Sequence, residues 1–299
     1  MADRPHFDLE LFLALNEEYR ARPIVPQPRS FDDRSLADGA ARRLDQIEKR
    51  LDLDGKRILE IGCGRGHICR RLADDYGCEA VGVDIKEYPH WQELSGNGVD
   101  LRIHDVSQDD NGVLGTFDVI LSFAVWEHVE HPYAALEGVR RLLAPEGRAY
   151  IYANLYRGPK ASHRYREVFF PWPHLLFTDE VFEQFYETTT GKPRRAAWVN
   201  KLTAAQYLFY FDQLGLVPEQ LWYSPDSFDE GFYARFPDPL NRYPRFDLSH
   251  DFISAVLRHV DGGSAPPGVQ VAPVSFARRL NRRTRRLWSS ARRRMSRTG

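Results

Sequence analysis

Cysteine and long apolar runs are both scarce in this chain of 299 residues. Its three cysteines, Cys63, Cys69 and Cys78, do not have the spacing of a disulfide framework, which favours a reducing compartment. No run of about 18 apolar residues occurs, so no membrane-spanning helix is predicted. The first residues lack the basic-then-apolar pattern of a signal peptide. Together these absences predict a cytoplasmic protein.

An overall excess of one charge sign is also absent, because the formal net charge is −1. The balance is uneven along the chain: residues 276–299 hold ten arginines and no acid, and the rest carries 31 basic and 42 acidic side chains. The apolar residues of this tail share one side of a helical wheel, a pattern typical of helices on anionic membranes. We expect the tail to contact the inner membrane face. Docking on the acidic body of its own chain or of a homodimer partner is the alternative, and no nucleic-acid partner is expected.

The most informative stretch is residues 57–66, Arg-Ile-Leu-Glu-Ile-Gly-Cys-Gly-Arg-Gly. Its apolar first half is typical of a buried parallel strand, and the alternating glycines let a ligand approach the backbone closely. A helical pattern follows, so the unit opens a nucleotide-type α/β fold. However, His67 replaces the third glycine of a dinucleotide fingerprint, and the Gly-Lys-Ser/Thr of a P-loop is absent. Glu60, just before the glycines, would repel phosphate and suits a cationic ligand.

Strand and helix patterns then alternate along the chain. This alternation predicts a doubly wound, mostly parallel sheet. We therefore expect an α/β, Rossmann-like fold with seven strands and a helical, aromatic lid insertion. The predicted strands span residues 58–61, 79–83, 99–104, 117–123, 148–153, 216–223 and 252–259, and the predicted helices include 7–22, 35–51, 132–143 and 203–215.

The same pattern divides the chain into parts. Residues 1–52 are predicted to form an N-terminal helical cap, and residues 53–262 the core. A substrate-lid insertion, rich in aromatic residues, histidine and arginine, interrupts the core at 154–202. Residues 263–299 are predicted to form a linker and a basic amphipathic tail.

Polar residues stand where three successive strands end. Asp84 ends the second predicted strand and Asp105 the third, while Ser122 and Phe123 end the fourth. In an open α/β sheet, ligands bind along this carboxyl edge. Asp84 is placed to accept from both hydroxyls of a ribose, and Asp105 from the exocyclic amine of adenine.

In combination these motifs resemble the class I S-adenosylmethionine-dependent methyltransferases. The resemblance covers roughly residues 36–153, through the glycine loop and the segments 82–85, 105–106, 117–129 and 140–147. It implies that Glu60 lies near the methionine end of the cofactor, that Asp84 holds the ribose, and that Asp105 and Val106 bracket adenine. The cofactor-binding set that it implies is Glu60, Gly62, Cys63, Gly64, Asp84, Ile85, Asp105, Val106, Ser122 and Phe123.

A hydroxyl acceptor needs a general base or a metal ion, because it is a poor nucleophile at neutral pH. His128 directly follows the fourth strand and is the first candidate base, unless it caps or packs the next helix. Glu127 and His128 are also candidate ligands for Mg²⁺, since similar pairs occur in some metal-dependent members of the family. His163 and His174, in the insertion, are further candidate bases.

The acceptor is predicted from the insertion, where Phe169, Phe170 and Trp172 stand among polar residues. Aromatic faces between polar groups suit a polyhydroxylated ligand, and the alternative is that these rings pack a lid onto the sheet. We predict an S-adenosylmethionine-dependent O-methyltransferase acting on a hydroxyl of a saccharide or glycolipid. Methylation of a phenolic, quinone or other small secondary metabolite is the second hypothesis. A non-catalytic cofactor-binding scaffold is the third.

Overall fold

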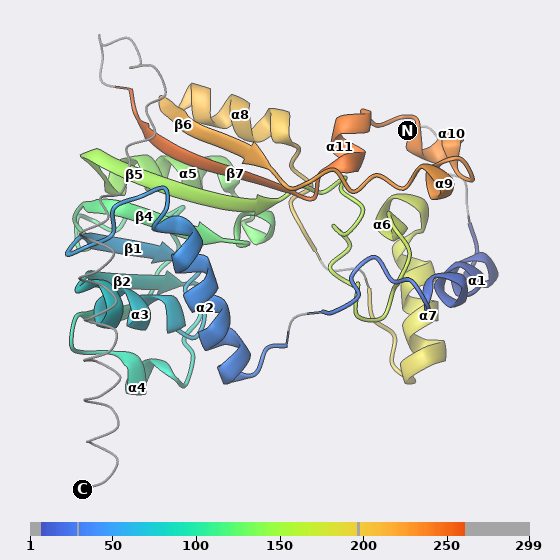
Figure 1. Cartoon of the computed structure of the whole chain (residues 1–299), viewed down its shortest axis with the longest axis horizontal. Coiled ribbons are helices and arrows are strands. Elements are labelled where there is room, and N and C mark those ends of the chain that lie inside the picture. The colour runs from blue at the N-terminus through green and yellow to red at the C-terminus, as the bar shows by residue number, and fades with distance from the viewer. Residues whose placement is uncertain (1–6, 29, 196–197, 261–299) are drawn as a thin grey trace, which may run out of the picture.

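The computed structural model describes residues 7–28, 30–195 and 198–260, which form two lobes side by side (Figure 1). One lobe is a sheet with helices on both faces, and the other is a cluster of helices and loops. The predicted linker and basic tail, 263–299, lie outside the described residues. Within these residues, no helix is both long and apolar enough to cross a membrane.

A seven-stranded sheet forms the first lobe, with the strand order β3-β2-β1-β4-β5-β7-β6. Strands β1 to β5 run parallel, and β7 is antiparallel to both of its neighbours. The predicted fold class, a mostly parallel seven-stranded α/β sheet, is confirmed. The strands are β1 (Arg57–Ile61), β2 (Glu79–Asp84), β3 (Val99–Ile103), β4 (Phe117–Phe123), β5 (Leu143–Asn154), β6 (Leu216–Tyr223) and β7 (Phe252–His259).

Helices cover both faces of the sheet. One layer holds α2 (Asp33–Ile47), α3 (His67–Tyr76) and α4 (Trp91–Leu94), and the other holds α5 (Pro132–Leu142) and α8 (Ala204–Gln213). Side chains alternate along a strand, so Ile58 of β1 packs with the first layer, whereas Leu59 and Ile61 pack with the second. The same alternation turns Glu60 towards α2 and α3.

The second lobe has a hydrophobic core of its own, built from three stretches that are distant in the sequence. At its centre the fully buried ring of Phe12 contacts the rings of Phe170, Phe177 and Phe185, with centroids 4.7 to 5.1 Å apart. The lobe is therefore an independently packed unit rather than a loose flap. Its helices are α1 (Leu9–Tyr19), α6 (Pro173–Leu176), α7 (Asp179–Thr190), α9 (Glu230–Tyr233), α10 (Pro237–Leu240) and α11 (Arg245–Ser249).

The aromatic residues of the insertion belong to this core. Phe170 and Trp172 have no exposed surface, and Phe169 packs at the edge of the same cluster. The indole Nε1 of Trp172 donates to the carbonyl oxygen of Leu248 at 3.1 Å. Of the two interpretations of these rings, packing therefore holds for Phe170 and Trp172, although they pack inside the second lobe and not on the sheet. Their faces are not available to stack on a sugar.

The two helices of the predicted N-terminal cap, 1–52, pack on different lobes. Helix α1 packs against α7, and α2 packs against α3. The connection between them follows the boundary of the lobes, where the N–H of Ile24 donates to the carbonyl oxygen of Phe169 at 3.0 Å. Near its end, the guanidinium of Arg166 lies 4.8 Å from the ring centroid of Phe31.

Candidate active site

A cleft of about 800 Å³ opens at the carboxyl edge of β1, β2 and β4. Its position is that of ligand sites in open α/β sheets, and its volume lies in the range of small-molecule sites. Ser122, 1% exposed, does not line this cleft. The other predicted cofactor residues all do: Glu60, Gly62, Cys63, Gly64, Asp84, Ile85, Asp105, Val106 and Phe123.

The loop between β1 and α3 requires glycine for two different reasons. Gly62 has a φ of +71°, and a Cβ there would lie 2.3 Å from Cγ2 of Val125. Gly64 has a φ of +51°, and a Cβ there would meet nothing within 4 Å. The first glycine allows the loop to touch the segment after β4, and the second leaves backbone accessible in the cleft.

Two hydrogen bonds hold Gly64 in place. Its N–H donates to Oδ2 of Asp84 at 3.0 Å, and its carbonyl oxygen accepts from Nε1 of Trp91 at 2.6 Å. Asp84 is the last residue of β2, which pairs with β1, so the sheet register brings its carboxylate to the loop. Asp105, beyond the end of β3, accepts from the N–H of Ser107 at 2.9 Å. Both predicted carboxylates therefore line the cleft, and each accepts a hydrogen bond from a backbone N–H.

An acidic and a basic side chain lie together at one end of the cleft. Glu60 is 4% exposed, its Oε2 accepts from Sγ of Cys69 at 3.1 Å, and burial raises its pKa to about 8. The guanidinium of Arg43 lies 5.3 Å from the ring centroid of Phe123, and its charge acts against the pKa shift of Glu60. Glu60, when ionised, can pair with a cationic group of a ligand, and Arg43 can pair with a carboxylate.

Arg43 was missed by the sequence analysis, although the sequence carries a signal for it. Ala40, Leu44 and Ile47 are the buried residues of α2. Arg43 lies three residues after Ala40 and four before Ile47, so it shares the buried face of the helix. A charged residue within a buried stripe indicates either a partner or a ligand.

The turn after β4 carries Glu127 and His128. It begins at Ala124, which has a φ of +55°, and continues as a short 3-10 helix, η1 (Trp126–His128). His128 lines the cleft, whereas Glu127 is 3% exposed and its Oε2 accepts from the N–H of Asn154 at 3.4 Å. The two adjacent side chains thus point into different surroundings.

His163, from the insertion, joins this pair. Its ring meets the ring of His128 edge to face, with centroids 5.2 Å apart and an interplanar angle of 80°. Burial, together with the neighbouring His128, lowers the pKa of His163 to about 4, so its imidazole is neutral at pH 7. The structure brings together two histidines that the sequence singled out separately.

Glu127, His128 and His163 are also close enough to share a metal ion, since their ligating atoms all lie within 4.8 Å of one another. Mg²⁺ prefers oxygen ligands, and only the carboxyl of Glu127 supplies them here, since the two histidines offer nitrogen. Burial also raises the pKa of Glu127, which favours its neutral form. The residues fit Mg²⁺ poorly, and an imidazole-rich set is better suited to a transition metal or to acid–base work.

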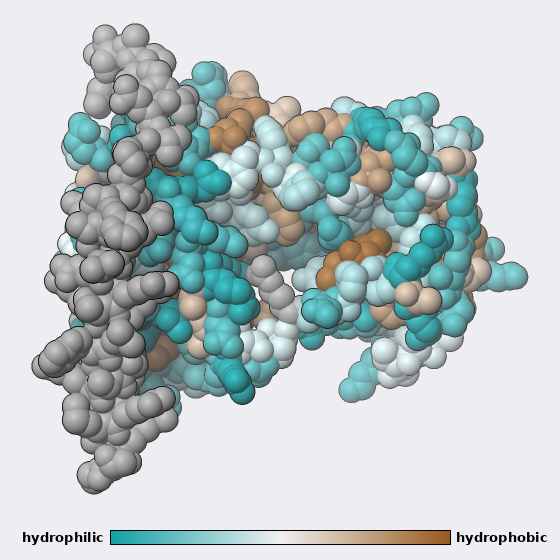
Figure 2. Space-filling model, viewed as in Figure 1, coloured by the Kyte–Doolittle hydropathy of each residue, from teal (hydrophilic) through white to brown (hydrophobic). Residues whose placement is uncertain are grey.

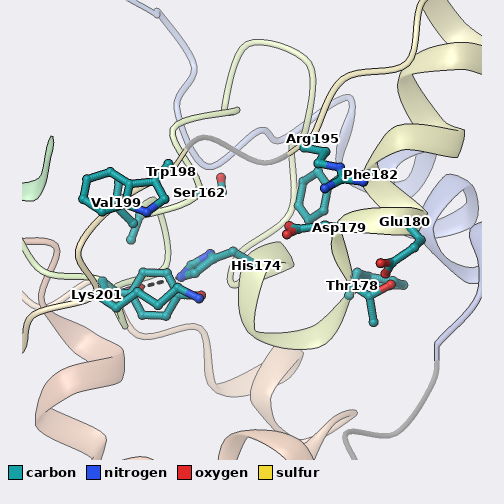
Figure 3. A pocket seen from close by; sticks show the side chains of 13 residues that line it. Ser162, His174, Thr178, Asp179, Glu180, Phe182, Arg195, Trp198, Val199 and Lys201 are labelled. Carbon is teal, nitrogen blue, oxygen red and sulfur yellow. Dashed lines mark hydrogen bonds between the residues drawn. The ribbon is translucent and has the colours of Figure 1, made fainter. Parts of the chain in front are cut away.

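His174 lies apart from these residues, in a second cavity of about 530 Å³ inside the other lobe (Figure 3). Its ring is 6% exposed, and its Nε2 donates to the carbonyl oxygen of Tyr156 at 2.6 Å. Lys201 lines this cavity on one side of His174 and Arg195 on the other. The structure therefore does not bring His174 to the histidine pair at the cleft.

Comparison with known proteins identifies the family. The sequence profile described as "Methyltransferase domain" matches residues 29–190, more than half of the chain. The chain belongs to this family and is an S-adenosylmethionine-dependent methyltransferase. The cofactor predicted from the glycine loop and the acidic strand ends is therefore confirmed.

The relatives come from several bacteria. A protein of Pseudomonas aeruginosa (strain LESB58), named ubiquinone biosynthesis O-methyltransferase, is 32% identical over 167 residues, which cover 54% of this chain and 68% of that protein. One of the same name from Dechloromonas aromatica (strain RCB) is 32% identical over 125 residues, which cover 40% of this chain and 53% of that protein. Among solved structures, the PH0226 protein from Pyrococcus horikoshii OT3 has a TM-score of 0.49 at 20% identity, covering 81% of this chain and 98% of that one.

Proposed function

We propose that this chain is an O-methyltransferase whose acceptor is a hydroxyl on a phenolic or quinone-derived ring. The curated relatives carry the name ubiquinone biosynthesis O-methyltransferase, which supports the second sequence hypothesis over the saccharide or glycolipid acceptor. The buried rings of Phe170 and Trp172 remove the main argument for a sugar. Family membership likewise leaves the non-catalytic scaffold without support.

In this proposal the cofactor lies along the cleft, with adenine beside Asp105 and Val106 and the ribose hydroxyls on Asp84. The carboxylate of its methionine part pairs with Arg43, and the ionised form of Glu60 faces its cationic end. Charge complementarity supports this direction, because the basic and the acidic side chain share one end of the cleft. When bound, the cofactor supplies a methyl group on a cationic sulfur.

The observation that carries the proposal is the contact between His128, which lines the cleft, and His163, whose ring packs edge to face against it. The acceptor oxygen would form a bond to that methyl group, and the sulfur would keep the electron pair of the broken C–S bond. The proton of the hydroxyl passes to an imidazole. Proton transfer to an imidazole is less unfavourable from a phenol, with a pKa of about 10, than from the much less acidic hydroxyl of a saccharide.

Turnover against a panel of acceptors tests this function. The panel contains catechol, hydroquinone and simple phenols on one side and alkyl glycosides on the other, and the readout is acceptor-dependent release of S-adenosylhomocysteine. We expect turnover of the dihydroxy aromatics and none of the glycosides. Reactions without acceptor correct for hydrolysis, and turnover of glycosides alone would overturn the proposal.

A further inference from the structure

Asn154 occupies a junction between the two lobes and contacts two of the candidate catalytic residues. It is the last residue of β5, is 4% exposed, and immediately precedes the insertion. Its backbone N–H donates to Oε2 of Glu127 at 3.4 Å, and its side-chain Oδ1 lies 3.3 Å from Nε2 of His163. One residue therefore holds Glu127 through its backbone and His163 through its side chain.

The orientation of the Asn154 amide is fixed by a third partner. Its Nδ2 donates to the carbonyl oxygen of Asp251 at 3.0 Å, and a carbonyl can only accept. The nitrogen of the amide must therefore face Asp251, which leaves the oxygen facing His163. The Asp251 carbonyl is itself held, because it also accepts from the N–H of Leu155 at 2.7 Å.

This orientation decides where the proton of His163 sits. An amide oxygen accepts and cannot donate, so the hydrogen bond to Nε2 requires a proton on Nε2. In a neutral imidazole the lone pair is then on Nδ1. His163 also has a φ of +56°, a conformation that a residue other than glycine keeps only when its surroundings fix it.

We propose that Asn154 is a positioning residue that fixes His163 as the neutral tautomer with its proton on Nε2 and its lone pair on Nδ1. This inference rests on the proposed function for its role in catalysis. When the acceptor O–H bond breaks, Nδ1 takes the proton, and the resulting imidazolium keeps its Nε2–H donated to Oδ1 of Asn154. The dipole of the amide stabilises that cation. Unlike a carboxylate, the amide places no negative charge beside the neutral imidazole before the proton is transferred.

The test reads the tautomer and the kinetics of the full chain together. In protein labelled with ¹⁵N-histidine, long-range ¹H–¹⁵N spectra distinguish the two neutral tautomers, and the His163 signals are those lost in His163→Gln. We expect the wild type at pH 7.5 to carry the proton on Nε2. Asn154→Leu should give a mixture of tautomers and lower kcat by roughly 10- to 100-fold, with the KM values for cofactor and acceptor within about threefold.

Two further variants separate positioning from general structural damage. Asn154→Asp retains an acceptor for Nε2–H and should regain at least about tenfold of the lost kcat. Asn241→Leu is the control and should leave every readout unchanged. Among the described contacts, the amide oxygen of Asn241 accepts only from the hydroxyl of Tyr233. Cofactor affinity measured by calorimetry reports whether each variant is folded.

The proposal is overturned if wild-type His163 carries its proton on Nδ1, or if Asn154→Leu changes neither tautomer nor kcat. The spectrum of the wild type decides the first point even if Asn154→Leu does not fold. A wild-type enzyme that methylates none of the phenolic acceptors would refute the proposed function, whereas the assignment of the tautomer would stand or fall on the spectra alone.

Discussion

The backbone N–H of Gly64 donates to Oδ2 of Asp84 at 3.0 Å, across the edge shared by β1 and β2. The same carboxylate thus shapes the glycine loop and, in our proposal, receives the ribose of the cofactor. Loss of this side chain removes a ligand contact and releases the loop at the same time. Both effects fall on cofactor binding before any chemistry takes place.

Asp84→Ala should therefore weaken cofactor binding at least about 100-fold, since each hydrogen bond to a charged group contributes roughly 1.5 to 3 kcal/mol. Calorimetric titration with S-adenosylmethionine measures the change. Asp238→Ala, at an exposed aspartate of α10, is the matched control and should bind as the wild type does. An unchanged affinity in Asp84→Ala would refute the assignment of this residue.

Gly62→Ala should destabilise the protein more than the same change at Gly191. Both glycines have nearly the same φ, +71° and +72°, but only at Gly62 would the new Cβ strike a neighbour, Val125. We expect about 1 to 2 kcal/mol of lost stability from the left-handed backbone at either site, and about 1 to 3 kcal/mol more at Gly62 from overpacking. Urea denaturation of both variants compares the two losses, and equal losses would contradict the contact.

The burial of Glu60 predicts a pH dependence of cofactor selectivity. Its pKa of about 8 in the fold, against 4.5 for an unperturbed glutamate, means that folding favours its protonated form. The stabilising contribution of this group is therefore present below pH 4.5 and is lost as the pH rises towards 8. A cationic sulfonium favours ionised Glu60, so S-adenosylmethionine should gain affinity relative to S-adenosylhomocysteine as the pH rises.

The ratio of the two dissociation constants measures this effect between pH 6.5 and 9. It should shift towards S-adenosylmethionine by about tenfold or more. The α-amino groups of both ligands titrate in the same range and largely cancel in the ratio. Glu60→Gln should give a flat ratio, and a flat ratio in the wild type would exclude ionisation of Glu60 near the sulfonium.

Removal of Mg²⁺ should leave methyl transfer within about twofold of its starting rate, because the imidazole-rich set at Glu127, His128 and His163 suits Mg²⁺ poorly. Initial rates are compared before and after dialysis against EDTA. A loss that Mg²⁺ restores would contradict this prediction. A loss restored by Zn²⁺ or Mn²⁺ but not by Mg²⁺ would identify the three side chains as a transition-metal site.

The sheet was predictable because its strands are short and apolar, and are punctuated by glycine, proline and aspartate. The glycine loop and Asp84 followed from local sequence alone, since the parallel register carries successive strand ends to one edge. The fifth strand was predicted to start at Arg148 but begins at Leu143, where Leu143 pairs with Phe117 before an irregular stretch. Pro145 and Gly147 resemble a turn in sequence, and they lie in this irregular stretch, before regular pairing resumes at Arg148.

The arrangement of the candidate catalytic residues was not predictable to the same degree. His128 follows β4 and His163 lies in the insertion, and their contact depends on how the insertion folds. His174 has the same sequence signal as His163 but lies in the other cavity. Arg43 could be assigned to the cleft only from the position of α2, which the sequence does not give. The aromatic run left two interpretations open, because a hydrophobic core and a ligand-binding surface have the same composition.

The second lobe draws on three separated stretches of chain, and Figure 2 shows that it forms a body of its own beside the sheet. Its last element, α11, ends at Ser249, two residues before the carbonyl that orients Asn154. During synthesis every residue that lines the cleft, from Phe31 to His131, therefore leaves the ribosome before the last part of this lobe does. The carbonyl of Asp251 is made later still, so in our proposal the tautomer of His163 is fixed after all the cofactor-binding residues have been made.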